Sequence, residues 1–274
     1  MNINSNSVCH YVCVFVVLVY RNTRDLQEFF ESNHIPNSHT IVVISHYDDD
    51  SDNEFQRIAS ENNADSILIP NRGYGYGNNK GVEFAIANYQ FDYLVISNAD
   101  ITIRCLNTKI LNRYNDYIVA PMIIAANGKK QNPNEPYKPS DLAYKLMYKT
   151  YSHNMTNVIW IFHGLAKLRR IYYNSIGKFF SGNEIYSAHG SFVILPFVVL
   201  KKLIPIYNEK IFLMNEESHL AMKARHLGIK TVYVKDIIID HKEDGSMSLE
   251  YKNEFPLQKQ SFMVFYDYWY KGER

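Results

Sequence analysis

The chain has 274 residues, enough to bury one sizeable core, and its length alone does not require a second domain. Its 29 Lys and Arg residues balance 28 Asp and Glu residues, and the formal net charge of +1 excludes sequence-independent nucleic-acid binding as the main task. The three cysteines, Cys9, Cys13 and Cys105, lack the number and spacing of a disulfide framework or a zinc site, so they favour a reducing compartment. We therefore expect a cytoplasmic protein with one domain.

The first hundred residues alternate apolar β-branched runs with amphipathic segments, which is typical of a parallel sheet covered by helices. The apolar run 12–20 is too short to span a bilayer and lacks the flanks of a signal peptide, so it predicts a buried strand. The pattern predicts strands over 11–20, 40–45, 66–70 and 93–97, with helices over 25–32, 53–62 and 79–89.

After Asp100 the alternation ends. The Asn127-Gly128 pair favours a tight turn after a short strand. Residues 141–178 are aromatic and basic with weak helical periodicity, which indicates an insertion laid over the sheet. Beyond it, the sequence predicts a strand over 188–195, a helix over 215–228 that ends at a glycine, a strand pair over 230–241 and a final amphipathic helix over 254–271.

The stretch "NRGYGYGNNKG", residues 71–81, lies between a predicted strand and a predicted helix, where α/β sheets bind ligands. It does not fit a dinucleotide fingerprint, because the sixth position counted from Gly73 is Asn78. It does not fit a Walker loop either, because Lys80 is followed by Gly81. Glycines would still let backbone N–H groups approach an anionic ligand, and a glycine-rich corner without a ligand is the alternative.

Four ionisable side chains follow predicted strands or begin a predicted helix. Asp100 ends "LVISNAD" and could hold a divalent cation against a diphosphate, or simply begin a turn. Glu216 and Glu217 begin a predicted helix, where their side chains diverge by about 100°, so only one could act as general base. Alternatively, both carboxylates are there because the helix dipole stabilises negative charge at a helix N-terminus. His241 could be a metal ligand or a structural residue.

Taken in chain order, these elements resemble the family-2 glycosyltransferases of the GT-A fold, and particularly the rhamnosyltransferase-like branch that builds bacterial surface polysaccharides. The resemblance rests on six motifs and covers about residues 14–248. The motifs are "VYRN" with Tyr20 and Asn22, the glycine-rich stretch, "SNAD", "HGSF", "FLMNEESHL", and "HKEDGS", which has one extra residue between His241 and Gly245.

The resemblance implies an α/β fold of the GT-A type, with a mostly parallel central sheet flanked by helices, a helical aromatic and basic insertion, and a C-terminal helix. It implies a single domain over 8–274. That domain would comprise a nucleotide-binding half over 8–121, an acceptor and catalytic half over 122–250 with the insertion at 138–185, and a tail helix over 251–274.

The resemblance also implies site residues. Glu217 would be the catalytic base with Glu216 beside it, Asp100 and His241 would hold Mg²⁺ or Mn²⁺, and Gly190 and Ser191 would line the floor below the transferred sugar. The reaction would be a single displacement with inversion, in which the base takes the acceptor's hydroxyl proton. Contacts to the nucleotide sugar would come from Tyr20, Asn22, Ser45, Asn71, Gly73, Asn79, Lys80, Asn98 and Asp100.

The chain departs from the family pattern at the nucleobase. The second strand of the family usually ends in an aspartate that reads the base, but Ser45 and His46 stand here, so the donor base stays open. The acidic run that starts at Asp48 either replaces part of that contact or caps a helix. Arg72 or Lys80 could supply the positive charge that family variants carry in the glycine-rich stretch.

The segment 138–178 carries seven Lys or Arg residues against one acid, Asp141. Tyr144, Tyr148, Tyr151 and Met155 recur at helical spacing, so this segment could lie on an anionic membrane surface, or pack on the sheet with its cations facing water. We expect a nucleoside-diphosphate sugar as donor, a glycan or lipid-linked acceptor and transfer of a hexose or deoxyhexose. The expected location is cytoplasmic, and it would be the inner face of the plasma membrane if this segment binds lipid. The oligomeric state stays open.

Two other functions remain. A degenerate transferase-like domain could serve only as a binding subunit of an assembly complex, for which Ser45 argues weakly. A sugar-nucleotide pyrophosphorylase would carry a glycine-rich signature near the first strand, where "VYRNTRD" has no glycine.

Overall fold

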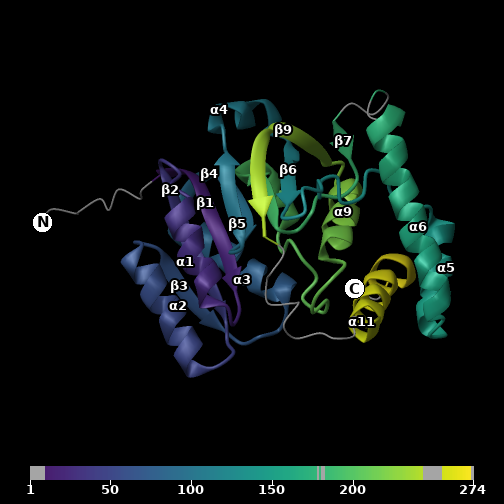
Figure 1. Ribbon diagram of the computed structural model, residues 1–274, viewed down its shortest axis with the longest axis horizontal. Coiled ribbons are helices and arrows are strands. Elements are labelled where there is room, and N and C mark those ends of the chain that lie inside the picture. The colour runs from purple at the N-terminus through teal and green to yellow at the C-terminus, as the bar shows by residue number, and fades with distance from the viewer. Residues whose placement is uncertain (1–9, 178, 180–182, 243–254, 273–274) are drawn as a thin grey trace, which may run out of the picture.

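A computed structural model describes residues 10–177, 179, 183–242 and 255–272 (Figure 1). Cys9 and the Gly245 and Ser246 part of the last motif lie outside the described residues. The described cysteines, Cys13 and Cys105, are free thiols, the first buried and the second exposed.

A nine-stranded sheet forms the centre of the molecule, in the order β3-β2-β1-β4-β8-β6-β9-β5, with β7 paired to β9 (Figure 1). The strands are β1 His10–Val19, β2 Ser38–Ser45, β3 Asp65–Ile69, β4 Gln90–Asn98, β5 Ile101–Cys105, β6 Tyr117–Ala125, β7 Glu184–Ile185, β8 Phe192–Pro196 and β9 Lys230–His241. The helices are α1 Thr23–Ser32, α2 Asp49–Glu61, α3 Tyr74–Asn88, α4 Thr108–Leu111, α5 Asp141–Ser152, α6 Thr156–Tyr172, α8 Phe197–Leu203, α9 Glu216–His226 and α11 Phe255–Tyr266. Shorter helical turns are η1 Asn112–Tyr114, η2 Tyr173–Gly177 and η3 Asp267–Lys271.

Strand β1 is buried on both faces, as its continuous apolar run predicts. Val14 and Val16 join the core on one side of the sheet, and Phe15 and Val17 join the core on the other side. Alternate side chains of a strand point to opposite faces, so both faces must be covered to keep this run from water. Helices cover both faces, and the predicted α/β fold with a central sheet is confirmed.

The strands of the sheet change direction beyond β4. Strands β3, β2, β1 and β4 are all parallel, whereas β8 runs antiparallel to both β4 and β6. Strand β9 is parallel to β6 but antiparallel to β5 and β7. The reversed direction of β8 brings its first residues beside the last residues of β4, which positions the candidate site.

Residues 230–241 form one strand, so the prediction of a strand pair is wrong. The pairing of β9 with β6 shifts register between Pro121 and Met122, where Val234 and Ile238 are their successive partners. This bulge leaves Lys235 and Asp236 exposed without ending the strand. An apolar run interrupted by two charged residues gives the same sequence pattern as two strands.

The glycine-rich stretch is helical from Tyr74, five residues before the helix expected at Asn79. Its glycines allow α3 to lie close against the sheet. A Cβ at Gly77 would lie 2.5 Å from Leu18 Cδ1, and a Cβ at Gly81 would lie 2.3 Å from Val16 Cγ1. The stretch is therefore mainly a packing surface of a helix, and the expectation of an open loop is corrected.

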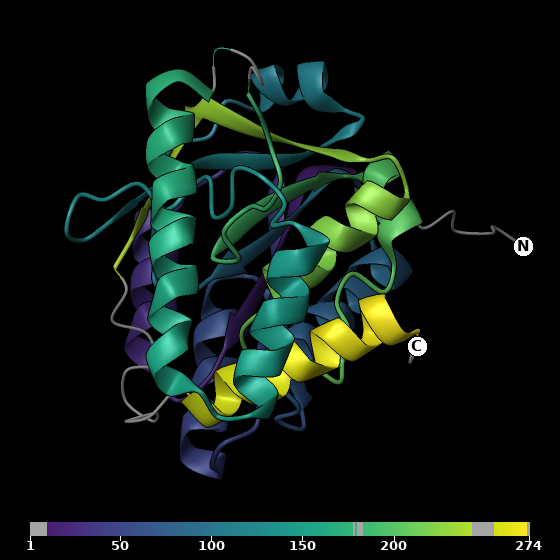
Figure 2. The same cartoon turned by 90° about the vertical axis from the view of Figure 1, so that its right-hand side faces the viewer.

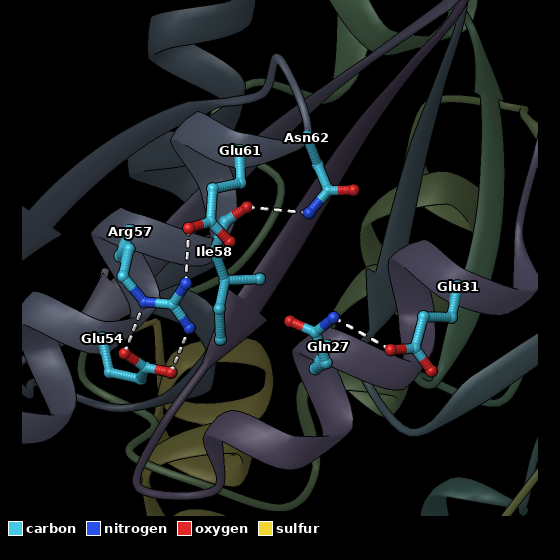
Figure 3. A network of polar contacts seen from close by, with 7 residues as sticks. All are labelled: Gln27, Glu31, Glu54, Arg57, Ile58, Glu61 and Asn62. Carbon is cyan, nitrogen blue, oxygen red and sulfur yellow. Dashed lines mark hydrogen bonds and ion pairs between the residues drawn. The ribbon is translucent and has the colours of Figure 1, made fainter.

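Helices α1 and α2 are amphipathic, with polar side chains bonded along their outer surfaces. Asp48 caps α2 by accepting a hydrogen bond from the Ser51 N–H at 2.8 Å, which confirms the capping interpretation of the acidic run. Arg57 bridges Glu54 and Glu61 along the exposed side of α2 (Figure 3).

Helices α5, α6 and α11 lie at the end of the molecule away from α1, α2 and β3 (Figures 1 and 2). Tyr144 and Tyr151 of α5 are buried against Phe262 of α11. Of the two interpretations of the tyrosine stripe, packing within the protein holds for these two tyrosines, and they pack on α11 rather than on the sheet. Within the described residues, no helix is long and apolar enough to cross a membrane.

We expect Gly81→Ala to destabilise the protein by about 1–3 kcal/mol, because the new methyl group would collide with Val16 and Val43 in a packed interface. Gly164→Ala in α6 is the matched control, since no atom lies within 4 Å of a Cβ there, and it should stabilise by about 0.5–1 kcal/mol. Equilibrium urea unfolding of both variants measures the two free-energy changes. An unchanged stability of Gly81→Ala would contradict the packing role.

Candidate active site

Two strand pairings bring the predicted metal ligands together at one edge of the sheet. The Asn98 backbone N–H donates to the Ser191 carbonyl at 2.9 Å, which joins the end of β4 to the segment before β8. Asp100 follows two residues later. Because Ile101 of β5 pairs with His241 of β9, and the Lys242 N–H donates to the Asp100 carbonyl at 3.0 Å, Asp100 and His241 become neighbours.

Asp100 and His241 form a buried pair, with 3.3 Å between Oδ2 and Nε2. His241 Nδ1 lies 2.8 Å from Gln131 Oε1. Since that oxygen can only accept, Nδ1 carries a proton, and a second proton on Nε2 lets the charged ring donate to Asp100. A metal ion would take the place of this second proton. Burial opposes ionisation of Asp100, but its hydrogen bond to His241 and the charge of that ring leave the pKa of the carboxyl below its ordinary value. A carboxylate and an oriented imidazole nitrogen are suitable ligands for a divalent cation.

His189 is a second imidazole at this edge that the sequence analysis did not identify. Its ring centroid lies 5.6 Å from that of His241. Its Nδ1 accepts from the Ser191 backbone N–H at 3.2 Å, and the backbone N–H of His189 donates to Asn132 Oδ1 at 2.8 Å. Burial lowers the pKa of His189 to about 4, so this ring is neutral at physiological pH and carries its proton on Nε2.

The acidic pair begins α9 after two residues in the left-handed region, Met214 and Asn215, both with φ of 71°. Such a conformation is unfavourable for side-chain-bearing residues and persists where the surrounding structure holds it. The carboxyl of Glu216 is buried, and its Oε1 has no hydrogen-bond partner among the described residues. Glu217 is half-buried against Gly190, where a Cβ would lie 2.8 Å from Glu217 Oε1. The two carboxyls thus diverge as expected.

The pKa values of both glutamates are raised. Burial raises the pKa of Glu217, although backbone N–H groups of Glu217 and Gly190 partly offset it. Burial, and then the charge of Glu217, raises the pKa of Glu216 well above its ordinary value. Tyr74 lies beside them: its hydroxyl donates to the Gly190 carbonyl at 2.8 Å, and its own pKa is raised by burial and by the charges of Glu217 and Glu216.

The glycine-rich stretch holds the segment that leads into α9. The Tyr74 N–H donates to the Phe212 carbonyl at 2.8 Å, and a Cβ at Gly73 would lie 2.1 Å from that same oxygen. Asn79 is buried and donates to the Tyr207 carbonyl at 2.9 Å while accepting from the Tyr207 N–H at 3.1 Å. These bonds give Asn79 a structural role, and its contact with the nucleotide stays a prediction.

Lys80 and Asn71 lie at opposite ends of this stretch. The Lys80 ammonium lies 2.6 Å from Glu83 and 5.6 Å from the ring of Tyr76, all on α3. This pairing keeps its charge on the helix surface and gives no support to the expected donor contact. Asn71 is exposed, and its Oδ1 accepts from the Gly73 N–H at 3.4 Å.

A groove of about 750 Å³ lies beside the Asp100 and His241 pair, where β1 and β9 end. Tyr20 stacks edge-on against Tyr47 at 5.4 Å, and Asn22 donates to Asp25 at 2.6 Å. The groove is lined by Arg21, Asn22, Arg24, Asp25, Glu28, Tyr47 and Lys242. Sequence reasoning did not single out its three cations. Glu28 pairs with Arg24 and Lys242, and the Arg21 guanidinium lies 4.4 Å from the centre of the Tyr47 ring.

Ser45 is buried at the end of β2, next to His46. His46 Nδ1 lies 2.5 Å from Asp52 Oδ2, and together with Asp49 these residues are close enough to hold a cation. Acidic residues in the first turn of a helix are also stabilised by its dipole, so this cluster is explained by the start of α2.

Comparisons with known proteins agree on the fold. No family model matches the sequence, and no curated protein is significantly similar to it. Among solved structures, GalNAc-T7 with UDP, GalNAc and Mn²⁺ is similar over 88% of this chain and 45% of its own, at 9% identity and a TM-score of 0.55. A mannosyltransferase from Pyrobaculum calidifontis with GDP-Man and Mn²⁺ is similar over 94% of this chain and 70% of its own, at 14% identity and a TM-score of 0.56. TarS from S. aureus is similar over 84% of this chain and 36% of its own, at 13% identity and a TM-score of 0.50.

These similarities show the GT-A fold. This chain spans less than half of the length of GalNAc-T7 and of TarS. Because each identity is below 25%, the likeness concerns the architecture, and the activity has to be argued from the site.

Glu216→Gln should change stability in a pH-dependent way. Folding raises the pKa of Glu216, so its stabilising contribution is complete at low pH and is lost as the pH rises through the raised pKa. The variant removes the buried charge, so its melting temperature relative to wild type should increase from pH 5 to pH 8. A gain of about 1 kcal/mol would appear as roughly 2–4 °C in a chain of this size.

Thermal unfolding at both pH values, with the exposed Glu61→Gln as control, measures this difference. The same offset at both pH values would contradict a raised pKa at Glu216.

Proposed function

We propose that this protein is an inverting, metal-dependent glycosyltransferase that moves a sugar from a nucleoside diphosphate to a hydroxyl of a glycan or lipid-linked acceptor. The observation that carries the proposal is the arrangement at the edge between β4 and β8. There, the Asn98 N–H bonds to the Ser191 carbonyl two residues before Asp100, which pairs with His241, and Glu217 lies against the neighbouring Gly190. The GT-A neighbours crystallised with UDP or GDP-Man and Mn²⁺ support this interpretation.

The donor would occupy the groove beside this pair. Arg21, Arg24 and Lys242 line it, and a diphosphate would compete with Glu28 for the last two. Tyr20, Asn22, Ser45, Asn71, Gly73 and Asn98 would lie around the nucleoside, as the family resemblance implies. Asp100 and His241 would hold Mg²⁺ or Mn²⁺, which when bound neutralises charge on the nucleoside-diphosphate leaving group. The Gln131 contact keeps the His241 nitrogen available for this purpose.

Glu217 would be the general base. Its half-buried position and raised pKa favour uptake of a proton. The acceptor hydroxyl would lose its proton to Glu217 and form a bond to the anomeric carbon as the bond from that carbon to the diphosphate oxygen breaks. Attack from the opposite face inverts the anomeric configuration. Gly190 and Ser191 would line the sugar subsite, and Glu216 would support the base from the core.

Finer parts of the proposal are supported by the six sequence motifs. They include membership of family 2 and its rhamnosyltransferase-like branch, transfer of a hexose or deoxyhexose, and a role in bacterial capsule, O-antigen or cell-wall synthesis. They also include the single domain over 8–274 with its nucleotide-binding and acceptor halves.

Glu217→Gln should lower kcat by about 10²–10⁴-fold, because the amide cannot accept the hydroxyl proton, while donor affinity stays close to wild type. Glu61→Gln, far along α2, is the matched control and should leave both quantities unchanged. Transfer and donor binding would be measured for all three proteins. A Glu217→Gln enzyme with wild-type kcat would refute the assigned base.

Nucleoside diphosphates should stabilise the protein in a metal-dependent and base-dependent way. A thermal-shift screen of UDP, GDP and TDP with Mn²⁺ or Mg²⁺ should give a clear shift for a preferred base. Asp100→Asn should abolish the part of the shift that requires metal, whereas the exposed Asp116→Asn should retain it. Equal shifts with and without metal in the wild type would contradict the metal site.

A further inference from the structure

Helix α6 carries apolar side chains on its outward face as well as its inward one. On the inward side Ile159 is buried in the core. The outward side chains recur at helical spacing and are between 43% and 75% exposed. We define the α6 outer face by six of them: Trp160, Ile161, Leu165, Leu168, Ile171 and Tyr172.

An exposed apolar face of this kind indicates an interaction surface. Surface helices normally present polar residues to water, and helices that are apolar all round are normally covered. Helix α6 lies along the outer side of the molecule beside α5 (Figures 1 and 2). Its 17 residues are about 26 Å long and do not form a span, so a lipid surface would receive the helix lengthwise.

The charged residues of the stretch 142–177 all carry one sign. Residues 142–177 contain five Lys or Arg residues and no Asp or Glu. Arg169 is paired with Glu135 at 3.2 Å. The remaining α5 and α6 lysines, Lys145, Lys149 and Lys167, are exposed and form no ion pair within the described part of the chain.

We propose that the α6 outer face docks on an anionic lipid surface, with its apolar side chains in the interface and the three lysines near the headgroups. A second copy of the chain is a poorer occupant, because a two-fold contact through this face would bring the lysines together without an acid to pair them. The docking stands apart from catalysis. Its use in presenting a lipid-linked acceptor to Glu217 rests on the proposed function.

Vesicle co-sedimentation tests the docking. The wild type should bind vesicles of equal parts phosphatidylcholine and phosphatidylglycerol, and bind phosphatidylcholine vesicles much less. Replacing Lys145, Lys149 and Lys167 by Gln should weaken binding to the mixed vesicles by about a hundredfold. Replacing Ile161, Leu165 and Leu168 by Ser should weaken it by about a hundredfold or more.

Matched controls use exposed residues elsewhere. The apolar control combines Leu68→Ser with Val198→Ser, and the charge control replaces Lys129, Lys130 and Lys235 by Gln. Both variants should bind vesicles as the wild type does. Circular dichroism and melting temperature establish that each variant is folded. Trp160 emission, read in a Trp269→Phe background, should shift to shorter wavelength on vesicles.

Three outcomes would overturn the proposal: no vesicle binding by the wild type, equal binding by the apolar variant, or a wild-type dimer that the Ser substitutions dissociate. The assay contains neither donor nor acceptor. A protein that binds vesicles but transfers no sugar would refute the proposed function and leave the docking intact. A protein that transfers sugar but does not bind vesicles would refute the docking and leave the proposed function intact.

Discussion

The close contact between the start of α3 and the chain that leads into α9 is the constraint on which the site depends. Gly73 lies directly against the Phe212 carbonyl, and Tyr74 donates its N–H to the same oxygen. One turn later Asn79 bonds both backbone groups of Tyr207. A buried side chain that satisfies a backbone N–H and a carbonyl at once is costly to remove, because both groups would then be left without partners. These contacts fix where α9 begins, and therefore where Glu217 meets Gly190.

The same edge of the sheet holds carboxyl groups with opposite pKa shifts. His241 keeps the pKa of Asp100 low in spite of burial, whereas burial dominates at Glu216 and Glu217 and raises both. A carboxyl that stays ionised is suited to a cation, and one that takes up a proton more readily is suited to general base catalysis. The environments thus separate the roles of chemically similar side chains.

The sequence predicts those features that depend on local pattern. The buried strand β1 follows from its apolar run, and the divergence of Glu216 from Glu217 follows from the helical repeat. The Asp100 and His241 pair was expected only through the family resemblance, because 140 residues separate the two positions and the β5 and β9 register joins them. His189 and Gln131 carry no local signal of their long-range bonds. The glycines of α3 misled the prediction because a helix that must pack closely and a flexible loop share the same composition.

The insertion is connected to the catalytic edge through a short series of contacts. Arg169 of α6 pairs with Glu135, whose N–H lies 3.3 Å from the Ser187 carbonyl, and the Ser187 hydroxyl donates to the Glu217 carbonyl at 3.3 Å. Helix α6 and the candidate base are thus held by the same segment of chain. If the α6 outer face rests on lipid, the bilayer surface lies on the side of the molecule to which this segment leads. An acceptor anchored in that bilayer would then approach Glu217 along this segment.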